Sequence, residues 1–400
     1  MPSRMSSPRR PRSLAAAIAG VSVAVVLCGS IGAAAASGTT GRPAAGQPAV
    51  PLAAGQVGTR SAVPWRRVGA GWALAQYTRS SALFAPHKKV KPITLYLVDP
   101  AGGKYALYRW PATRSPWYLV DWSGDKTRAL FIAAGTGSRN VLHQLVLATG
   151  AVSTFTLPAN VSPIGYTRPD GKNLLAVADG IARYNLRGVF QARLARGTLE
   201  EIAISAADGL TEVVSGSRGL ELVSNSGGLI RRLRVPGTAP RLGCNPVRWW
   251  SASTVLAACL PTKSLESRLW LVPVSGAAPK ALTPIRKPSS HDYGDVDAWR
   301  LPSGLYLQAL GPCGTEYIGK QEAGGSVKMI NVPGGGANNN RIAAVTGRRM
   351  LVQVQTGCPG SDSLVWFNPA TRAVQKVLTA PGNEAGVLTV VAYNRKGNQP

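Results

Sequence analysis

The side chains with the richest chemistry gather in one short segment, 291–297 (HDYGDVD). It holds His291, Asp292, Asp295 and Asp297, so three of the chain's ten aspartates fall within six residues. Oxygen-rich loops of this kind can hold calcium, but the segment lacks the D-x-D-x-D-G order of a calcium loop. Because Asp295 and Asp297 alternate on an expected strand, we favour a hydrogen-bonded connecting loop and keep the four residues as candidate ligand-binding positions.

Two pairs of aspartates could perform glycoside chemistry, which uses two carboxyl groups that flank the scissile bond. One pair is Asp295 and Asp297, and the other is Asp121 and Asp125. A serine hydrolase would instead show Gly-x-Ser-x-Gly on a strand-turn-helix elbow. The nearest match, at 215–219 (SGSRG), has serine in place of the first glycine and falls between two expected strands. The sequence therefore shows no serine-hydrolase motif. We expect no catalytic residue, and glycoside chemistry at one of the aspartate pairs stays the alternative.

The histidines do not form a metal-binding pattern. His87, His143 and His291 are the three histidines of the chain, and none of them follows another at the H-x-x-x-H or H-E-x-x-H spacing of zinc sites. We expect no bound metal and no cofactor.

The elements that must position these residues form a repeat. An apolar run, a turn and a second apolar run recur seven times, with turns near Gly103, Gly150, Gly188, Gly227, Gly276, Gly324 and Thr371. These positions are 38 to 49 residues apart, which is the period of a propeller blade. Because a second hairpin lies between most of these units, each blade has four expected strands. The sequence predicts an all-β, seven-bladed β-propeller.

The two ends of the repeat are expected to share one sheet. The first blade lacks a convincing first strand before 71–77 (GWALAQY). The C-terminal segment 387–397 (VLTVVAYNRKG) ends in a sequence similar to 166–171 (YTRPDG). We predict that this C-terminal strand completes blade one, which removes the open edge of the ring. Six blades would require the shortest hairpin, 183–194, to merge into a connection.

The repeat units resemble the TolB-like propellers, in particular exported actinobacterial members of uncharacterised role. The resemblance rests on the turns at Ser123–Lys126 and Arg168–Lys172 and on the hairpins that begin at Leu95–Gly102 and Leu269–Gly276. It covers about Trp65 to Tyr393. These motifs are structural turn signatures, so the resemblance implies the propeller fold and transfers no catalytic residue. The family includes binding proteins and peptidases fused to an α/β-hydrolase domain, and the sequence shows no such domain.

The N-terminal part of the chain does not belong to the repeat. Residues 1–36 place four arginines before an apolar stretch that ends in four alanines, which is the pattern of a signal peptide; an uncleaved membrane anchor is the alternative. Residues 37–64 are rich in Ala, Gly and Pro and predict a flexible tether. One propeller domain would then cover 65–397.

The charge of the chain bears on its partners. Loss of residues 1–36 would lower the net charge from +27 to +23, and a charge of this size attracts polyanions in a salt-dependent way. No interleaving of basic and aromatic residues supports base stacking, so we expect no nucleic acid. The expected partner is an envelope polymer, polyanionic ones included, or an exported protein, bound by a monomer.

Four cysteines follow the first 36 residues, namely Cys244, Cys259, Cys313 and Cys358. An even number in an exported chain predicts two disulfides. Cys244 and Cys259 flank the first hairpin of blade five, so antiparallel pairing brings them together. Cys313 and Cys358 each follow the second strand of adjacent blades, so they form the other predicted bridge.

The absence of a catalytic set favours a binding role. We expect an exported, secreted or membrane-associated, non-catalytic propeller that binds a cell-envelope component or an exported protein. The alternative is a propeller enzyme that acts on glycans, or a cofactor-dependent oxidoreductase, with polar side chains that converge on the central tunnel.

Overall fold

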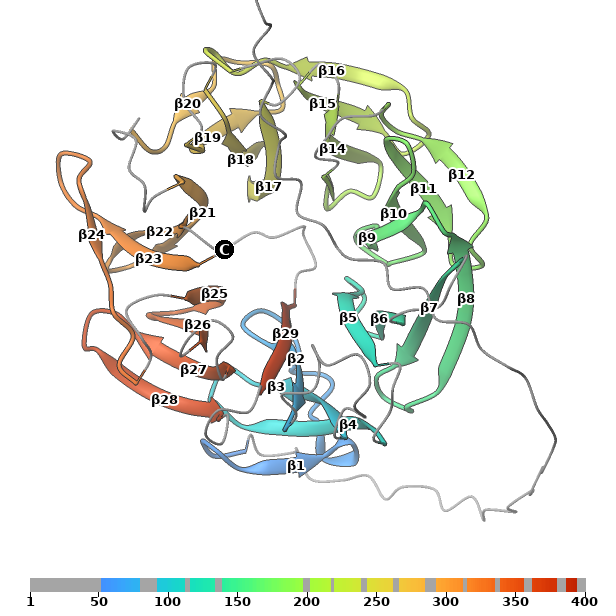
Figure 1. Ribbon diagram of the computed structural model, residues 1–400, viewed down its shortest axis with the longest axis vertical. Coiled ribbons are helices and arrows are strands. Elements are labelled where there is room, and N and C mark those ends of the chain that lie inside the picture. Colours follow the sequence, from blue (N-terminus) through green and yellow to red (C-terminus); the bar gives the residue numbers. More distant parts are fainter. Residues whose placement is uncertain are drawn as a thin grey trace, which may run out of the picture.

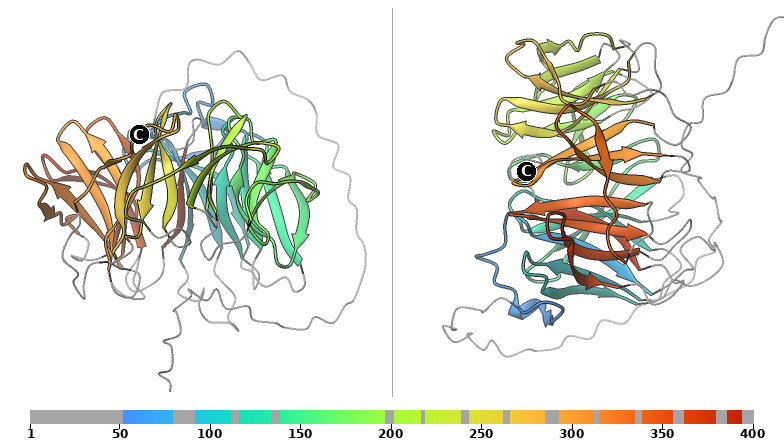
Figure 2. Two further views of the ribbon diagram at one scale, coloured as in Figure 1. Left: turned by 90° about the horizontal axis from the view of Figure 1, so that it is seen from above. Right: turned by 90° about the vertical axis from the view of Figure 1, so that its left-hand side faces the viewer.

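The computed structural model describes residues 52–79, 92–111, 116–133, 139–196, 202–216, 219–238, 243–261, 266–284, 293–311, 315–334, 339–355, 362–379 and 386–393. Their strands form one five-stranded and six four-stranded sheets. The sheets are arranged as blades around a central axis (Figure 1), and the side views show them as neighbouring sheets of one ring (Figure 2). The chain is a seven-bladed β-propeller, as predicted, and the six-bladed alternative is wrong because the hairpin at 183–194 belongs to a sheet of its own.

Each blade is numbered from its place in the chain. Blade one consists of β1 (Val57–Thr59), β2 (Ala73–Thr78), β3 (Ile93–Val98), β4 (Lys104–Trp110) and β29 (Val387–Ala392). Blade two consists of β5 (Trp117–Trp122), β6 (Arg128–Ala133), β7 (Arg139–Val146) and β8 (Val152–Pro158). Blade three consists of β9 (Ser162–Tyr166), β10 (Asn173–Val177), β11 (Ile181–Asn185) and β12 (Phe190–Arg193). Blade four consists of β13 (Ala203–Ser205), β14 (Thr211–Gly216), β15 (Gly219–Ser224) and β16 (Leu229–Leu233). Blade five consists of β17 (Cys244–Ser251), β18 (Thr254–Cys259), β19 (Arg268–Pro273) and β20 (Lys280–Ala281). Blade six consists of β21 (Asp295–Leu301), β22 (Gly304–Leu310), β23 (Glu316–Gln321) and β24 (Val327–Met329). Blade seven consists of β25 (Asn340–Thr346), β26 (Arg349–Gln355), β27 (Asp362–Asn368) and β28 (Ala373–Leu378).

The turns between the third and fourth strands follow the predicted chemistry. Five of the predicted turn glycines have a positive φ, which only glycine adopts without strain: Gly150, Gly188, Gly227, Gly276 and Gly324. The repeat is therefore encoded locally, hairpin by hairpin.

The C-terminal strand closes the ring. β29 pairs with β2 in antiparallel register, from Ala73 opposite Ala392 to Tyr77 opposite Val387, and it lies at the axial end of the blade-one sheet (Figure 1). The predicted closure is confirmed.

The other edge of blade one carries a strand that the sequence did not indicate. β1 and the short 3-10 helix η1 (Arg60–Ala62) lie within the segment expected to be a tether. β1 pairs in parallel with β4, and a Cβ at Gly58 would lie 2.9 Å from the Tyr105 ring. Backbone pairing with β4 and close approach to blade one hold this segment. It therefore forms a strand without an alternating apolar pattern. The packed part of the chain thus begins before Trp65.

The core lies between the blades. Seven clusters of buried apolar side chains are found among the described residues, one between each pair of neighbouring blades. Large aromatic side chains link the sheets: the Trp249 indole donates to the Ser205 carbonyl at 2.9 Å, and the Trp366 indole donates to the Asp99 carbonyl at 3.2 Å. Tryptophans between sheets pack in this way, with the ring buried and the indole N–H hydrogen-bonded.

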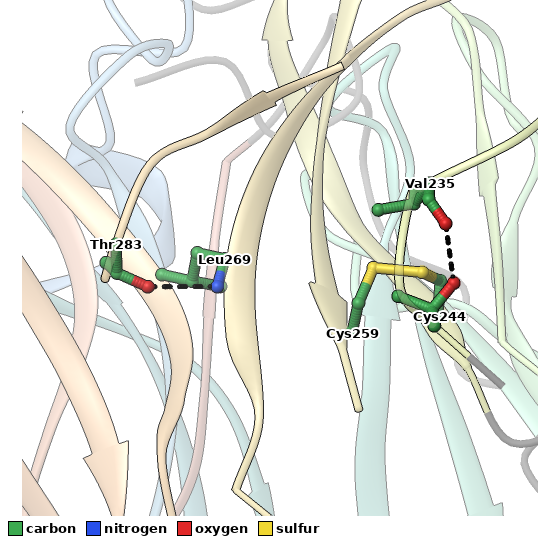
Figure 3. Close-up of a disulfide and its surroundings, with 6 residues drawn as sticks. Val235, Cys244, Cys259, Leu269 and Thr283 are labelled. Atoms are coloured by element: carbon green, nitrogen blue, oxygen red, sulfur yellow. Dashed lines mark hydrogen bonds between the residues drawn. A yellow bond between two sulfur atoms is a disulfide. The ribbon is translucent and has the colours of Figure 1, made fainter. Parts of the chain in front are cut away.

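The pair Cys244 and Cys259, expected from the sequence, forms a disulfide between neighbouring strands β17 and β18, with the two Cα atoms 4.0 Å apart (Figure 3). In the same blade, Thr283 fixes β19 by accepting a hydrogen bond from the Leu269 amide at 3.1 Å. Cys313 and Cys358 lie outside the described residues, so their pairing stays a prediction. The predicted signal peptide, residues 1–36, also lies outside them. Within the described part of the chain, no helix is long and apolar enough to cross a membrane.

Candidate functional site

A cavity of about 530 Å³ lies where the innermost strands meet, a size typical of small-molecule sites. All seven blades contribute to its wall, through β5, β9, β13, β17, β21, β25 and β29. Among the described residues, the charged ones that line it are three arginines and three carboxylates: Arg168, Arg248, Arg341, Asp121, Asp297 and Glu316.

A β-bulge recurs in the innermost strands and positions several of these side chains. The register shifts between Leu119 and Asp121 in β5, between Pro246 and Arg248 in β17 and between Asp295 and Asp297 in β21, and β17 has a second shift near its end. Bulges bend a strand and redirect its side chains. In these three blades the residue that follows the bulge is charged and lines the cavity.

On the side of blades two and three, the charges neutralise each other. Arg168 donates to both oxygens of Asp121, from Nη1 to Oδ2 at 3.0 Å and from Nη2 to Oδ1 at 2.9 Å. The Tyr166 amide also donates to Oδ2 at 2.8 Å. Bidentate pairs of this kind are strong and geometrically specific. We call Asp121, Tyr166 and Arg168 the closed side of the cavity, because both oxygens of the carboxylate are occupied.

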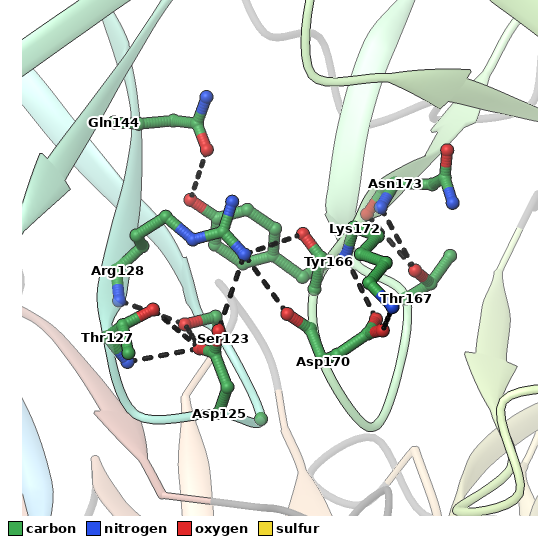
Figure 4. Close-up of polar contacts among 12 residues, drawn as sticks. Ser123, Asp125, Thr127, Arg128, Gln144, Tyr166, Thr167, Asp170, Lys172 and Asn173 are labelled. Atoms are coloured by element: carbon green, nitrogen blue, oxygen red, sulfur yellow. Dashed lines mark hydrogen bonds and ion pairs between the residues drawn. The ribbon is translucent and has the colours of Figure 1, made fainter.

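Asp125, the other member of that sequence pair, belongs to a turn. Its Oδ1 accepts hydrogen bonds from the Ser123 hydroxyl, the Thr127 amide and the Thr127 hydroxyl, and its Oδ2 lies 3.5 Å from Arg128 Nη2 (Figure 4). Arg128 in turn donates to the carbonyls of Asp170 and Gly171 in the next blade. Asp125 does not line the cavity, and its contacts make it a structural residue.

On the side of blades five and six, Arg248 is buried at 1% exposure. Its guanidinium carbon lies 3.5 Å from the centre of the Trp299 ring, and its Nη2 lies 2.9 Å from Asp297 Oδ1. Asp297 Oδ1 also accepts the Ala298 amide at 2.7 Å. Within the described residues, Asp297 Oδ2 makes no hydrogen bond or ion pair, so one carboxylate oxygen remains available to the cavity.

Two further charged side chains complete this side. Glu316, at the start of β23, is half-buried, and Arg341, in β25, is exposed although it lines the cavity. Neither side chain makes a hydrogen bond or an ion pair with another described residue, although the backbone amide of Glu316 donates to Asn339 Oδ1 at 3.1 Å. We call Asp297, Trp299, Glu316 and Arg341 the open side of the cavity.

The electrostatics of the open side couple its members. Burial raises the pKa of Asp297, and this is opposed by Arg248, by the Ala298 amide and by Arg341. Burial also raises the pKa of Glu316, opposed by Arg341 and reinforced by Asp297. Asp297 therefore acts on Glu316, and Arg341 acts on both carboxyl groups.

The structure separates the residues that the sequence grouped together. Asp297 lines the cavity, whereas Asp295 is 1% exposed and does not line it. The bulge between them breaks the expected alternation. His291 and Asp292 lie outside the described residues.

The sequence did not point to Arg168, Arg248, Glu316 or Arg341. A usable signal exists for Arg248, because a charged residue stands between apolar residues of an innermost strand and one blade period, 49 residues, before Asp297. Arg168 and Asp121 are 47 residues apart.

Metal chemistry finds no support in the described part of the chain. No group of three or more His, Cys, Asp or Glu side chains could hold an ion there. His143 stacks on Trp117 with ring centres 3.6 Å apart, and its Nδ1 lies 2.9 Å from the Thr154 hydroxyl.

Comparison with known proteins gives the fold and no family. No protein-family model matches the chain, and no curated protein matches it in sequence. Among solved structures, a protein of Bacteroides uniformis, provisionally named a 6-phosphogluconolactonase, is 14% identical with a TM-score of 0.51 over 80% of this chain and 98% of that chain. A Bacteroides fragilis protein with the same provisional name is 13% identical with a TM-score of 0.50 over 80% and 98%.

TolB from Acinetobacter baumannii is a more distant likeness, 15% identical with a TM-score of 0.42. The match covers 80% of this chain and 66% of the TolB chain. At 13–14% identity, the likeness to the two Bacteroides structures shows the propeller fold alone. A fold of this kind hosts many unrelated activities.

Proposed function

We propose that this chain is an exported propeller that binds a cell-envelope component or another exported protein through its axial cavity, without catalysing a reaction. The signal-peptide pattern of residues 1–36 supports export. The disulfide between Cys244 and Cys259 supports it as well, because such bonds persist in oxidising compartments.

The contrast between the two sides of the cavity carries the proposal. The closed side has no free carboxylate oxygen, so Asp121 cannot act as an acid or base opposite Asp297. The open side presents a free carboxylate oxygen of Asp297, the carboxylate of Glu316 and the guanidinium of Arg341. A cavity with a few convergent polar groups is a default binding site.

A second candidate, an enzyme that acts on glycans, is favoured by one observation. Asp297 and Glu316 both line the open side, and both have a raised pKa, which is the usual state of a general acid at work near neutral pH. Against it, Asp297 is held by Arg248 through its other oxygen.

A binding experiment on native envelope tests the proposal. The chain from residue 37 to residue 400 is immobilised, exposed to an envelope extract and washed with increasing salt, and the eluate and the supernatant are analysed. We expect a component that stays bound at moderate salt, is lost in Arg341→Gln and is kept in Arg348→Gln, a control arginine that is exposed outside the cavity. Binding that disappears at moderate salt in all variants would mean that net charge alone is responsible. Release of shortened glycan into the supernatant would support the enzyme.

A further inference from the structure

The open side offers both kinds of hydrogen-bonding group. Asp297 Oδ2 and the Glu316 carboxylate are acceptors, and the Arg341 guanidinium is a planar donor. All three side chains line the same cavity, from the neighbouring blades six and seven. A ligand that satisfies them must carry donors and acceptors close together.

The charge of the cavity wall argues against a strongly charged ligand. Among the described residues that line it, three arginines and three carboxylates balance, although the whole chain carries a net charge of +27. An anionic or cationic ligand would lose part of its hydration there and find no excess of opposite charge among these residues, which is costly. The excess of basic residues lies elsewhere in the chain.

Trp299 adds a fixed apolar surface. It is half-buried and lines the cavity, and the Arg248 guanidinium packed on its ring holds the indole in place. Arg248 itself is buried and forms an ion pair with Asp297. A ligand that meets Trp299 must present carbon-bound hydrogens next to its polar groups.

We propose that the open side binds an uncharged sugar unit of an envelope glycan. Adjacent hydroxyls of a sugar ring each donate one hydrogen bond and accept others, so they can bridge the Glu316 carboxylate and the planar Arg341 guanidinium while the C–H face of the ring packs against Trp299. Asp297 Oδ2 accepts from a further hydroxyl. The inference rests on the proposed binding function and specifies its ligand.

Titration of the chain from residue 37 to residue 400 tests this inference. The probes are N-acetylglucosamine, galactose, arabinose and the neutral oligosaccharides released from native envelope, with glucuronate and inorganic phosphate as charged competitors, followed by tryptophan fluorescence and calorimetry. We expect at least one neutral probe to bind, with affinity reduced at least tenfold by Glu316→Gln and by Arg341→Gln. The surface variants Glu322→Gln and Arg348→Gln should bind like the parent chain.

The outcomes separate this inference from the function on which it rests. If envelope binding persists while no neutral probe binds, or while glucuronate or phosphate binds better, the sugar assignment is wrong and the binding function stands. If neutral probes bind equally well to all variants, the site lies elsewhere. If neither the extract nor any probe binds, both are wrong.

Discussion

Asp121 and Asp297 hold equivalent positions in blades two and six, yet they have different surroundings. Each follows the bulge of an innermost strand and lines the same cavity. The blade after Asp121 supplies Arg168 and the Tyr166 amide, which occupy both of its oxygens. Among its described residues, the blade after Asp297 supplies no such partner, and Arg248 of the preceding blade contacts only Oδ1.

The difference shows how one backbone device serves two purposes. The bulge brings a charged side chain to the axis. Whether that side chain forms an ion pair within the protein or stays available to a ligand depends on the residues of the neighbouring blade. On the closed side the ion pair joins blade two to blade three. On the open side the remaining groups are available for recognition.

The largest expected effect comes from the removal of an arginine on each side. Arg168→Met leaves Asp121, with a side chain 12% exposed, without its counter-charge, and the free energy of unfolding should fall by about 3–5 kcal/mol. Arg341→Met should change it by about 0.5 kcal/mol or less, because Arg341 is exposed and unpaired within the described residues. Urea unfolding of both variants checks this. Equal losses of unfolding free energy in the two variants would contradict the distinction between the closed and the open side.

A pH titration extends the comparison to a carboxyl group without an ion pair. Glu212 in β14 is 1% exposed, its Oε2 has no hydrogen-bond partner, and burial raises its pKa from 4.5 to about 7. The folded chain therefore holds this proton more tightly than the unfolded chain. Its contribution to stability is complete below pH 4.5 and is lost as the pH rises through about 7.

Glu212→Gln should remove this loss. The shift corresponds to about 3 kcal/mol, so the variant should be more stable than the parent chain at pH 8 and similar to it at pH 4. Glu322→Gln, with a side chain 42% exposed, is the control. Parallel stability curves for the parent and Glu212→Gln from pH 4 to pH 8 would contradict the account.

A smaller effect is expected at Gly165, the residue after the bulge in β9. A Cβ there would lie 2.7 Å from Asp121 Oδ2, so Gly165→Ala should push the carboxylate away from Arg168 and cost about 1–2 kcal/mol. Ala344, after the bulge in β25, already carries a Cβ and remains buried. Gly69→Ala is the control, because Gly69, like Gly165, lacks a positive φ, and the nearest atom to a Cβ there would lie 4.0 Å away. A loss no greater than in this control would show that the closed side tolerates displacement.

The sequence predicted the parts of the fold that are local and repeated. The turn glycines set the hairpins, and the similarity between 166–171 and the C-terminal segment located the closing strand β29. β1 was missed because backbone pairing at a sheet edge requires little from side chains. The disulfide between Cys244 and Cys259 followed from the hairpin register.

The site was less accessible from the sequence. Alternation made Asp295 and Asp297 equivalent, and only the bulge between them separates the buried residue from the one that lines the cavity. Arg248 and Asp297 meet across two blades, and their contact depends on how the sheets pack. The periodicity of the sequence does not contain this information. A charged residue between apolar residues of an innermost strand, such as Arg248, is a signal that could locate residues of the cavity.

The most direct test of the central claim, that the open side is the binding surface, is hydrogen-exchange mass spectrometry of the chain from residue 37 to residue 400 with and without envelope extract. We expect slower exchange in peptides that contain β21, the start of β23 and β25, and unchanged exchange in β5 and β9. Protection confined to β5 and β9 or to the outermost strands, in a sample that has bound envelope material, would contradict the account.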